Sequence, residues 1–211
     1  MPVVVHMDHA QSPEIIRRAA EIGGFDEIMV DMSHYDENEN KAKTKELTAF
    51  LPENGTVAEA EPGRIHGGEK GFVVDTGKLE GVLTTPEQAE EFMALGIDWL
   101  APAFGNHHGN YGPQGPQLDY QRLGRIHEVA KGRVQLVLHG TNDFDEAIFQ
   151  KCIKGGVAKC HINNVMNDRW TEVQRNKAGR SPITSVIEEG TQAMQKAVEK
   201  YVDWVGSTGR A

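Results

Sequence analysis

The stretch Val134-Gln135-Leu136-Val137-Leu138-His139-Gly140 joins a run of apolar, β-branched residues to an imidazole and a glycine. A short apolar run of this kind is typical of a strand that is buried on both faces, as in a parallel sheet. The polar residues come directly after the run. We therefore expect a buried strand that delivers a functional side chain at its carboxyl end.

Five further segments repeat this arrangement along the chain. The other predicted strands are Val3–Val5, Ile28–Val30, Thr56–Ala58, Trp99–Ala101 and Val157–Ala158. Each leads into acids, imidazoles or amides, which lie within the segments His6–His9, Asp31–Ser33, Glu59–Glu61, Gly105–Gly109 and Lys159–Asn163.

Amphipathic helical patterns separate the predicted strands. The first covers Pro13–Ile22, with Ser12 as its N-cap and with Ile15, Ala19 and Ile22 on one face. The other predicted helices are Pro86–Leu95, Tyr120–Ala130, Asp145–Lys154 and Ile183–Val205.

Alternating strands and helices predict an α/β fold with a parallel sheet, here about six βα units in a single domain over residues 1–211. In a TIM-type (β/α)8 barrel the carboxyl ends of all strands meet on the face that carries the active site. A doubly wound open sheet would use mainly its switch point instead. Because polar residues follow all six runs, the sequence favours the barrel.

Composition excludes some partners. The 211 residues carry a net charge of −9, from 31 acidic and 22 basic residues, which argues against nucleic acid or an anionic membrane as the main partner. No apolar stretch is long enough to span a bilayer, and the N-terminus lacks the features of a secretory signal. With only Cys152 and Cys160, we expect reduced thiols and a cytoplasmic protein.

Three of the histidines at predicted strand ends, His9, His108 and His139, indicate a metal site. A single histidine after a strand is more often a hydrogen-bonding residue, but three together favour metal ligation. Neutral imidazoles suit zinc, and three protein ligands leave a position open for substrate. Asp8 and Glu69 are acid/base candidates, although an acid in a glycine-rich loop such as that around Glu69 is often simply solvated.

Five segments make the pattern specific: VVVHMDHA, EIMVDMSHYDENEN, VAEAEPGRIHGGE, LAPAFGNHHGNYG and LVLHGT. They resemble class II fructose-bisphosphate aldolases along essentially the whole chain. The resemblance implies a (β/α)8 barrel, a catalytic Zn²⁺, a sugar-phosphate substrate and a homodimer or larger assembly. By this resemblance the sequence begins at the family's third strand, so we expect a truncated barrel that lacks the first two βα units.

The resemblance assigns a role to each matching residue. It makes His9, His108 and His139 zinc ligands, and places Asp31 and Glu61 at an alternative or second metal position. Asp8 would exchange a proton with the aldehyde oxygen, and Glu69 would take the proton from the ketose half. The residues that would hold the dihydroxyacetone phosphate half are Gly109, Gly140, Thr141, Asn142, His161, Asn163 and Asn164.

The implied reaction is zinc-dependent aldol cleavage or formation of fructose 1,6-bisphosphate, or of a related ketose bisphosphate such as tagatose. It needs no Schiff base, so Lys159 is interpreted as a structural or phosphate-facing cation. The sequence departs from the family at Thr141-Asn142-Asp143, where an added carboxylate could repel phosphate, and at His161, Asn163 and Asn164. A non-catalytic remnant that binds metal or sugar phosphate, and a metal-dependent hydrolase, are the alternatives.

Overall fold

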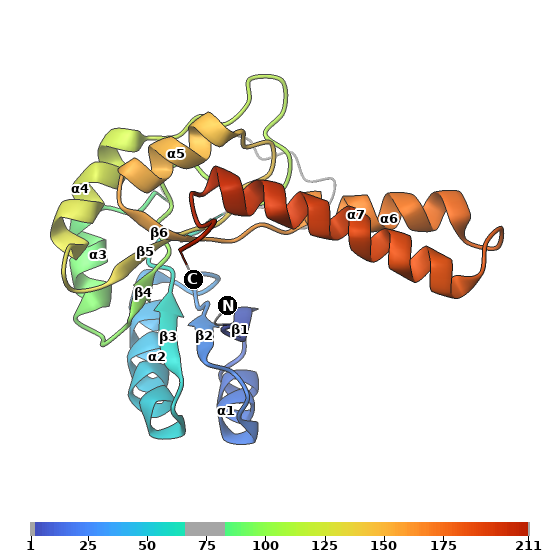
Figure 1. Cartoon of the computed structure of the whole chain (residues 1–211). Helices are drawn as coiled ribbons and strands as arrows, with labels where there is room; N and C mark the ends of the chain where they lie inside the picture. The colour runs from blue at the N-terminus through green and yellow to red at the C-terminus, as the bar shows by residue number, and fades with distance from the viewer. Residues whose placement is uncertain (1–2, 66–82, 211) are drawn as a thin grey trace.

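The computed structural model describes residues 3–65 and 83–210. Six parallel strands form one sheet in chain order, and the sheet curls so that one face becomes an interior (Figure 1). The strands are β1 (His6–Ala10), β2 (Glu27–Val30), β3 (Val57–Ala60), β4 (Trp99–Leu100), β5 (Gln135–Leu138) and β6 (Val157–Cys160). The predicted α/β class with a parallel sheet of six βα units is confirmed.

The helices are α1 (Pro13–Ile22), α2 (Glu37–Phe50), the 3-10 turn η1 (Leu51–Asn54), α3 (Pro86–Met93), α4 (Tyr120–Ala130), α5 (Glu146–Lys154), α6 (Asn164–Lys177) and α7 (Ile183–Trp204). Helices α1 to α5 lie between successive strands on the outer face of the sheet, and helices α6 and α7 follow the last strand. The last two pack against each other as a hairpin that extends away from the sheet (Figure 1). No helix of the described residues is both long enough and apolar enough to cross a membrane.

Successive strand residues point to opposite faces of the sheet, and this alternation separates two kinds of side chain. Outward-facing residues such as Ile28, Leu100 and Leu136 are fully or almost fully buried in two apolar clusters with the helices. On the inner face, Met29 and Val137 pack in a smaller apolar cluster. The remaining inner positions are mostly polar, so the interior of the curled sheet can hold the side chains of an active site.

The first strand begins later than predicted. Val3, Val4 and Val5 are 76%, 63% and 47% exposed and do not form a strand, whereas His6–Ala10 does. The backbone N–H of Val5 donates to the carboxylate of Asp26 at 2.7 Å, and pairing with β2 starts only at His6. The residues predicted to follow this strand therefore lie within it.

The first helix has the predicted boundaries and N-cap, but it buries a different face. The Ser12 hydroxyl accepts a hydrogen bond from the N–H of Ile15, as expected for an N-cap. The buried residues are Ile16, Ala19 and Ala20, whereas Ile15 and Ile22 are 53% and 71% exposed. Of the three residues predicted to form the apolar face, only Ala19 is therefore buried, and the helix packs along the stripe of Ile16, Ala19 and Ala20 instead.

Both cysteines are free, and burial raises the pKa of each thiol to about 12. At pH 8 only about one thiol in 10,000 would then be ionised, and Cys152 is also fully buried. We expect Ellman's reagent to label neither thiol at the rate of a free cysteine until guanidinium unfolds the chain. Rapid labelling of both thiols in the folded protein would contradict this burial.

Candidate metal centre and active site

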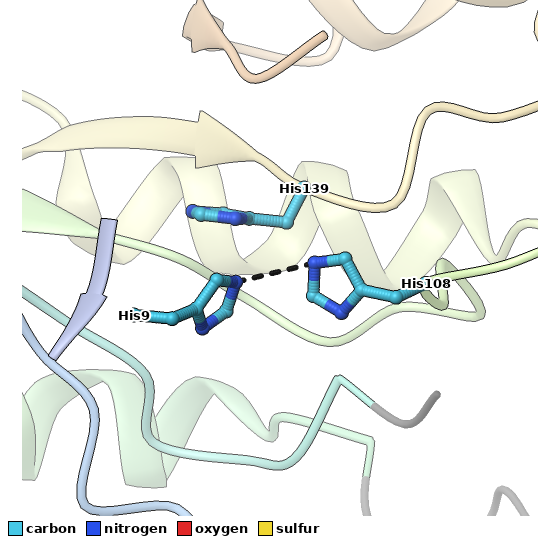
Figure 2. A group of neighbouring side chains, drawn as sticks. All are labelled: His9, His108 and His139. Carbon is cyan, nitrogen blue, oxygen red and sulfur yellow. Dashed lines mark hydrogen bonds between the residues drawn. The ribbon is translucent and has the colours of Figure 1, made fainter. Parts of the chain in front are cut away.

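Three histidines from separate parts of the chain meet at the carboxyl ends of the strands. His9 comes from β1, His108 from the loop after β4, and His139 from the residue that follows β5. One ring nitrogen of each lies within 4.8 Å of the others, and the Nε2 atoms of His9 and His108 are 3.2 Å apart. Figure 2 shows the three rings turned toward a common space. Such a gathering suits a metal ion with three imidazole ligands.

His139 has one ring nitrogen satisfied and the other free. Its Nε2 lies 2.6 Å from Glu59 Oε1, and this carboxylate is fully buried. Its Nδ1 is also buried but has no hydrogen-bond partner. Burial lowers the pKa of His139 to about 4, which leaves the ring neutral at pH 7. With Nε2–H donating to Glu59, the lone pair on Nδ1 is free to bind a metal.

His9 is oriented in the same manner by a second carboxylate. Its Nδ1 lies 2.9 Å from Asp31 Oδ2, while the hydroxyl and N–H of Ser33 donate to Asp31 Oδ1. Burial alone would raise the pKa of Asp31, but the hydrogen bonds from His9, Ser33 and Gln11 hold it well below its usual range. His9 adopts a φ of +47°, an uncommon left-handed conformation for a residue with a side chain.

His108 completes the group as a neutral ring. Burial, together with the neighbouring His9 and His139, lowers the pKa of His108 to about 4. Deprotonated imidazoles are the form that binds metal ions. The structure therefore brings together all three predicted ligands, with at least two of them neutral at physiological pH.

Glu61 has a buried carboxylate that is only partly satisfied. Its Oε1 accepts a hydrogen bond from the N–H of Ile65, but its Oε2 has no hydrogen-bond partner. Burial and the nearby Asp31 raise the pKa of Glu61 to about 8. His9, Asp31 and Glu61 offer ligand atoms within 4.8 Å of one another. Glu61, which the resemblance places at a second metal position, thus has an unused carboxylate oxygen near His9 and Asp31.

Asp8 places one carboxylate oxygen among several imidazoles. Its Oδ1 lies 3.3 Å from His161 Nδ1, 3.7 Å from His6 Nε2, and 3.9 Å from both His9 Nε2 and His139 Nδ1. Burial alone would raise the pKa of Asp8, but His161 and His6 outweigh it and hold the pKa well below its usual range. The side chain is half exposed, so an ionised carboxylate faces the space beside the metal group.

His161 was predicted to contact substrate, and the structure also ties it to the acidic residues. Its ring stacks on His139 with centroids 4.0 Å apart. Burial alone would lower the pKa of His161, but interactions with Asp8 and Glu59 outweigh it and raise the pKa to about 9. A positively charged His161 thus faces the carboxylate of Asp8.

A pocket of about 390 Å³ opens over the metal group. All seven residues predicted to hold the substrate line it: Gly109, Gly140, Thr141, Asn142, His161, Asn163 and Asn164. Gly140 is required as glycine because its φ is +68° and an added Cβ would lie 2.4 Å from the carbonyl oxygen of His107. Glu69, the predicted loop base, lies outside the described residues.

Sequence reasoning missed several residues of this site. Gln11, Ser33, His34, Arg64 and Ile65 also line the pocket. Glu59 was recognised only as one of the acids at a strand end, although the alternation Glu59-Ala60-Glu61 already placed both acids on one face.

Asp143 does not add a negative charge to the pocket wall, contrary to the concern that the sequence raised. Its carboxylate accepts a hydrogen bond from the backbone N–H of Tyr111 at 3.0 Å, and its φ is +60°. The Tyr111 hydroxyl in turn donates to the carbonyl of Gly140 at 2.6 Å. Asp143 therefore supports the loop that carries Gly140.

The family model of class II fructose-bisphosphate aldolases matches residues 1–210. The chain belongs to this family. As a member of it, the protein is an aldolase, an enzyme of the lyase class. A provisionally named fructose-bisphosphate aldolase of Coccidioides immitis is 57% identical over 218 aligned residues, which cover all of this chain and 72% of that protein.

Other relatives are more distant. A 6-phospho-5-dehydro-2-deoxy-D-gluconate aldolase of Shouchella clausii is 32% identical over all of this chain and 71% of its own length. Among solved structures, the provisionally identified Coccidioides immitis fructose-1,6-bisphosphate aldolase has a TM-score of 0.93 at 59% identity, covering 99% of this chain and 73% of that one. The YdjI aldolase of Escherichia coli K12 has a TM-score of 0.83 at 32% identity, and the match covers 100% of this chain and 72% of that one.

The geometry predicts that each of the three histidines is needed for metal binding. Substituting His9, His108 or His139 with alanine should weaken binding of a divalent metal by at least ~100-fold, because a three-ligand site becomes a two-ligand one. His34→Ala is the matched control, since His34 lines the pocket outside the group. Titration against a chromophoric chelator measures the affinities. Unchanged affinity in any of the three variants would remove that histidine from the ligand set.

Proposed function

We propose that this protein is a zinc-dependent aldolase that cleaves fructose 1,6-bisphosphate to dihydroxyacetone phosphate and glyceraldehyde 3-phosphate, and catalyses the reverse condensation. The observation that carries the proposal is the convergence of His9, His108 and His139, with a buried and unpartnered Nδ1 on His139. Three imidazoles form a donor set typical of catalytic zinc, which keeps one position open for substrate.

A bound Zn²⁺ would act as a Lewis acid toward the ketose oxygens and so stabilise the enediolate that forms on cleavage. The chain's own groups would handle the protons. Asp8, ionised and half exposed beside the metal group, is placed to accept the proton of the C4 hydroxyl as the C3–C4 bond breaks. The bonding electrons pass to the dihydroxyacetone half, and its C3 atom then takes up a proton. By the family resemblance, Glu69 is the residue that exchanges this proton with C3.

The other residues of the pocket would hold the substrate. Gly109, Gly140, Thr141, Asn142, Asn163 and Asn164 offer backbone and side-chain donors at the wall where the resemblance places the dihydroxyacetone phosphate half. Arg64, from the loop after β3, is the one arginine or lysine that residues 3–65 and 83–210 contribute to the wall. A guanidinium is suited to bind a phosphate or carboxylate in a bidentate manner.

Arg64 also bears on which ketose phosphate is used. The relative named for a phosphorylated dehydrodeoxygluconate shows that proteins similar to this chain differ in their named substrates. Fructose 1,6-bisphosphate carries a second phosphate beyond the dihydroxyacetone half, and Arg64 would bind that group. A tagatose bisphosphate would offer the same phosphate, so the stereochemistry at C4 is a separate question.

The polar interior favours catalysis over a non-catalytic remnant. A protein that only bound metal or sugar phosphate would not need an ionised acid held at 3.3–3.9 Å from four imidazoles. We also infer that the curled sheet corresponds to part of a (β/α)8 barrel, in one domain, as the resemblance implies. The homodimer and the cytoplasmic location stay predictions.

Cleavage can be measured directly. The zinc-loaded protein should cleave fructose 1,6-bisphosphate, with the release of triose phosphate followed by a coupled NADH assay. Asp8→Asn should lower kcat by about 100- to 10,000-fold, because the proton acceptor is lost while the shape is kept. Its zinc content should stay at one per chain. A zinc-loaded protein that cleaves no ketose phosphate would refute the proposed reaction, and release of an acid and an alcohol would indicate a hydrolase.

The role of Arg64 can be separated from the chemistry. Arg64→Met should lower kcat/KM for fructose 1,6-bisphosphate by about 10- to 100-fold, the cost of losing a charged hydrogen bond. It should change kcat/KM for fructose 1-phosphate, which lacks the second phosphate, much less. Arg18→Met, on the exposed surface of α1, is the matched control. An equal loss for both substrates would show that Arg64 does not recognise the second phosphate.

A further inference from the structure

A layer of charged side chains lies inside the curled sheet, next to the metal group. Glu27 on β2 is 3% exposed, Glu59 on β3 is fully buried, and Lys159 on β6 reaches both of them. The Lys159 Nζ atom is 2.7 Å from Glu27 Oε1 and 2.5 Å from Glu59 Oε2. Two buried carboxylates would be costly without a cation, so this lysine is what lets them lie together.

Glu59 uses its two oxygens for two different partners. Oε2 accepts from the Lys159 ammonium, and Oε1 accepts from Nε2–H of His139. The contact between Glu59 and His139 leaves Nδ1 of the ring free on the side of the metal group. The position of the ring therefore depends on the orientation of the carboxylate.

Lys159 is itself held in place. Besides its two carboxylate partners, its ammonium lies 5.1 Å from the centroid of the Trp99 ring, within the range of a cation–π contact. Lys159 is not among the residues that line the pocket. These contacts argue against a phosphate-facing role and for a structural one.

The same region is poorly suited to a second metal ion. His6, Glu27 and Glu59 offer ligand atoms within 4.8 Å of one another. However, the Lys159 ammonium already contacts both carboxylates. A divalent cation there would have to displace a buried ion pair and then lie beside the displaced charge.

We propose that Lys159 is a positioning residue for the metal centre: it fixes the Glu59 carboxylate so that Glu59 holds His139 with Nδ1 directed at the metal. The inference rests on the proposed role of His139 as a ligand. Without the ammonium, Oε2 of Glu59 could turn toward His161, whose Nε2 is 3.8 Å away, and Oε1 would leave His139. Lys159 thus acts on the metal through one intermediate carboxylate.

A double-mutant cycle tests this chain of contacts. Lys159→Met, Glu59→Gln and the double variant would be titrated with Zn²⁺ against a chromophoric chelator, with no substrate present. Each single substitution should weaken zinc binding about 10- to 100-fold, as the loss of a partner behind a metal ligand usually does. Because Lys159 acts through Glu59, the double variant should bind zinc no more weakly than Glu59→Gln.

Controls separate positioning from folding. Lys131→Met removes an exposed lysine at the end of α4 and should leave zinc affinity unchanged. Lys159→Gln keeps a hydrogen-bond donor in a side chain of similar volume. Its zinc affinity should fall between that of Lys159→Met and that of the original chain. The visible spectrum of the Co²⁺-loaded protein should change in Lys159→Met, because the geometry of the His139 ligand changes. Circular dichroism melts of the metal-free variants report folding.

Several results would overturn the proposal. Unchanged zinc affinity in a folded Lys159→Met variant would show that the ammonium does not act on the metal. Additive losses in the double variant would show that Lys159 acts independently of Glu59. Failure of both Lys159 variants to fold would make Lys159 a requirement of the fold instead. Because the cycle measures metal binding alone, it stays decisive even if the protein binds zinc but cleaves no fructose 1,6-bisphosphate.

Discussion

The contact between Glu59 and His139, 2.6 Å long and sealed inside the sheet, is the interaction on which the site depends. A carboxylate buried there must have its charge balanced and both oxygens hydrogen-bonded. The imidazole satisfies one oxygen and the Lys159 ammonium the other. The need to satisfy a buried acid therefore decides which nitrogen of His139 remains available. Asp31 orients the His9 ring in the same way, through its contact with Nδ1 of that ring.

The alternation of strand residues makes this interior possible. Positions that face outward pack against helices in the two large apolar clusters, which contain most of the buried apolar residues that the structure describes. Positions that face inward are then free to carry acids, imidazoles and one lysine. Because all six strands are parallel and in chain order, their inward residues at the carboxyl ends reach the same pocket. The outer face of the sheet thus forms the main apolar core, and the inner face carries the polar groups of the pocket.

Much of this arrangement could be predicted from the sequence, but the pairwise contacts could not. His9, His108 and His139 were recognised because each follows an apolar run, and the boundaries of α1 were recognised from Ser12 and Pro13. Helix α2 was missed because much of its buried face is polar, with Asn40, Thr44 and Thr48, so no apolar period marks it. The link from Lys159 to Glu59 joins residues 100 positions apart and requires the register of the sheet.

The irregular end of β1 allows something that a regular strand would forbid. In regular pleating, adjacent residues point to opposite faces, so Asp8 and His9 could not both reach the pocket. The register shift between Met7 and Ala10 and the left-handed backbone of His9 turn both side chains inward, to 3.9 Å from each other. The residue proposed as proton acceptor and the residue proposed as metal ligand are thereby adjacent in the chain. Only one peptide bond separates their Cα atoms, which holds these atoms ~3.8 Å apart.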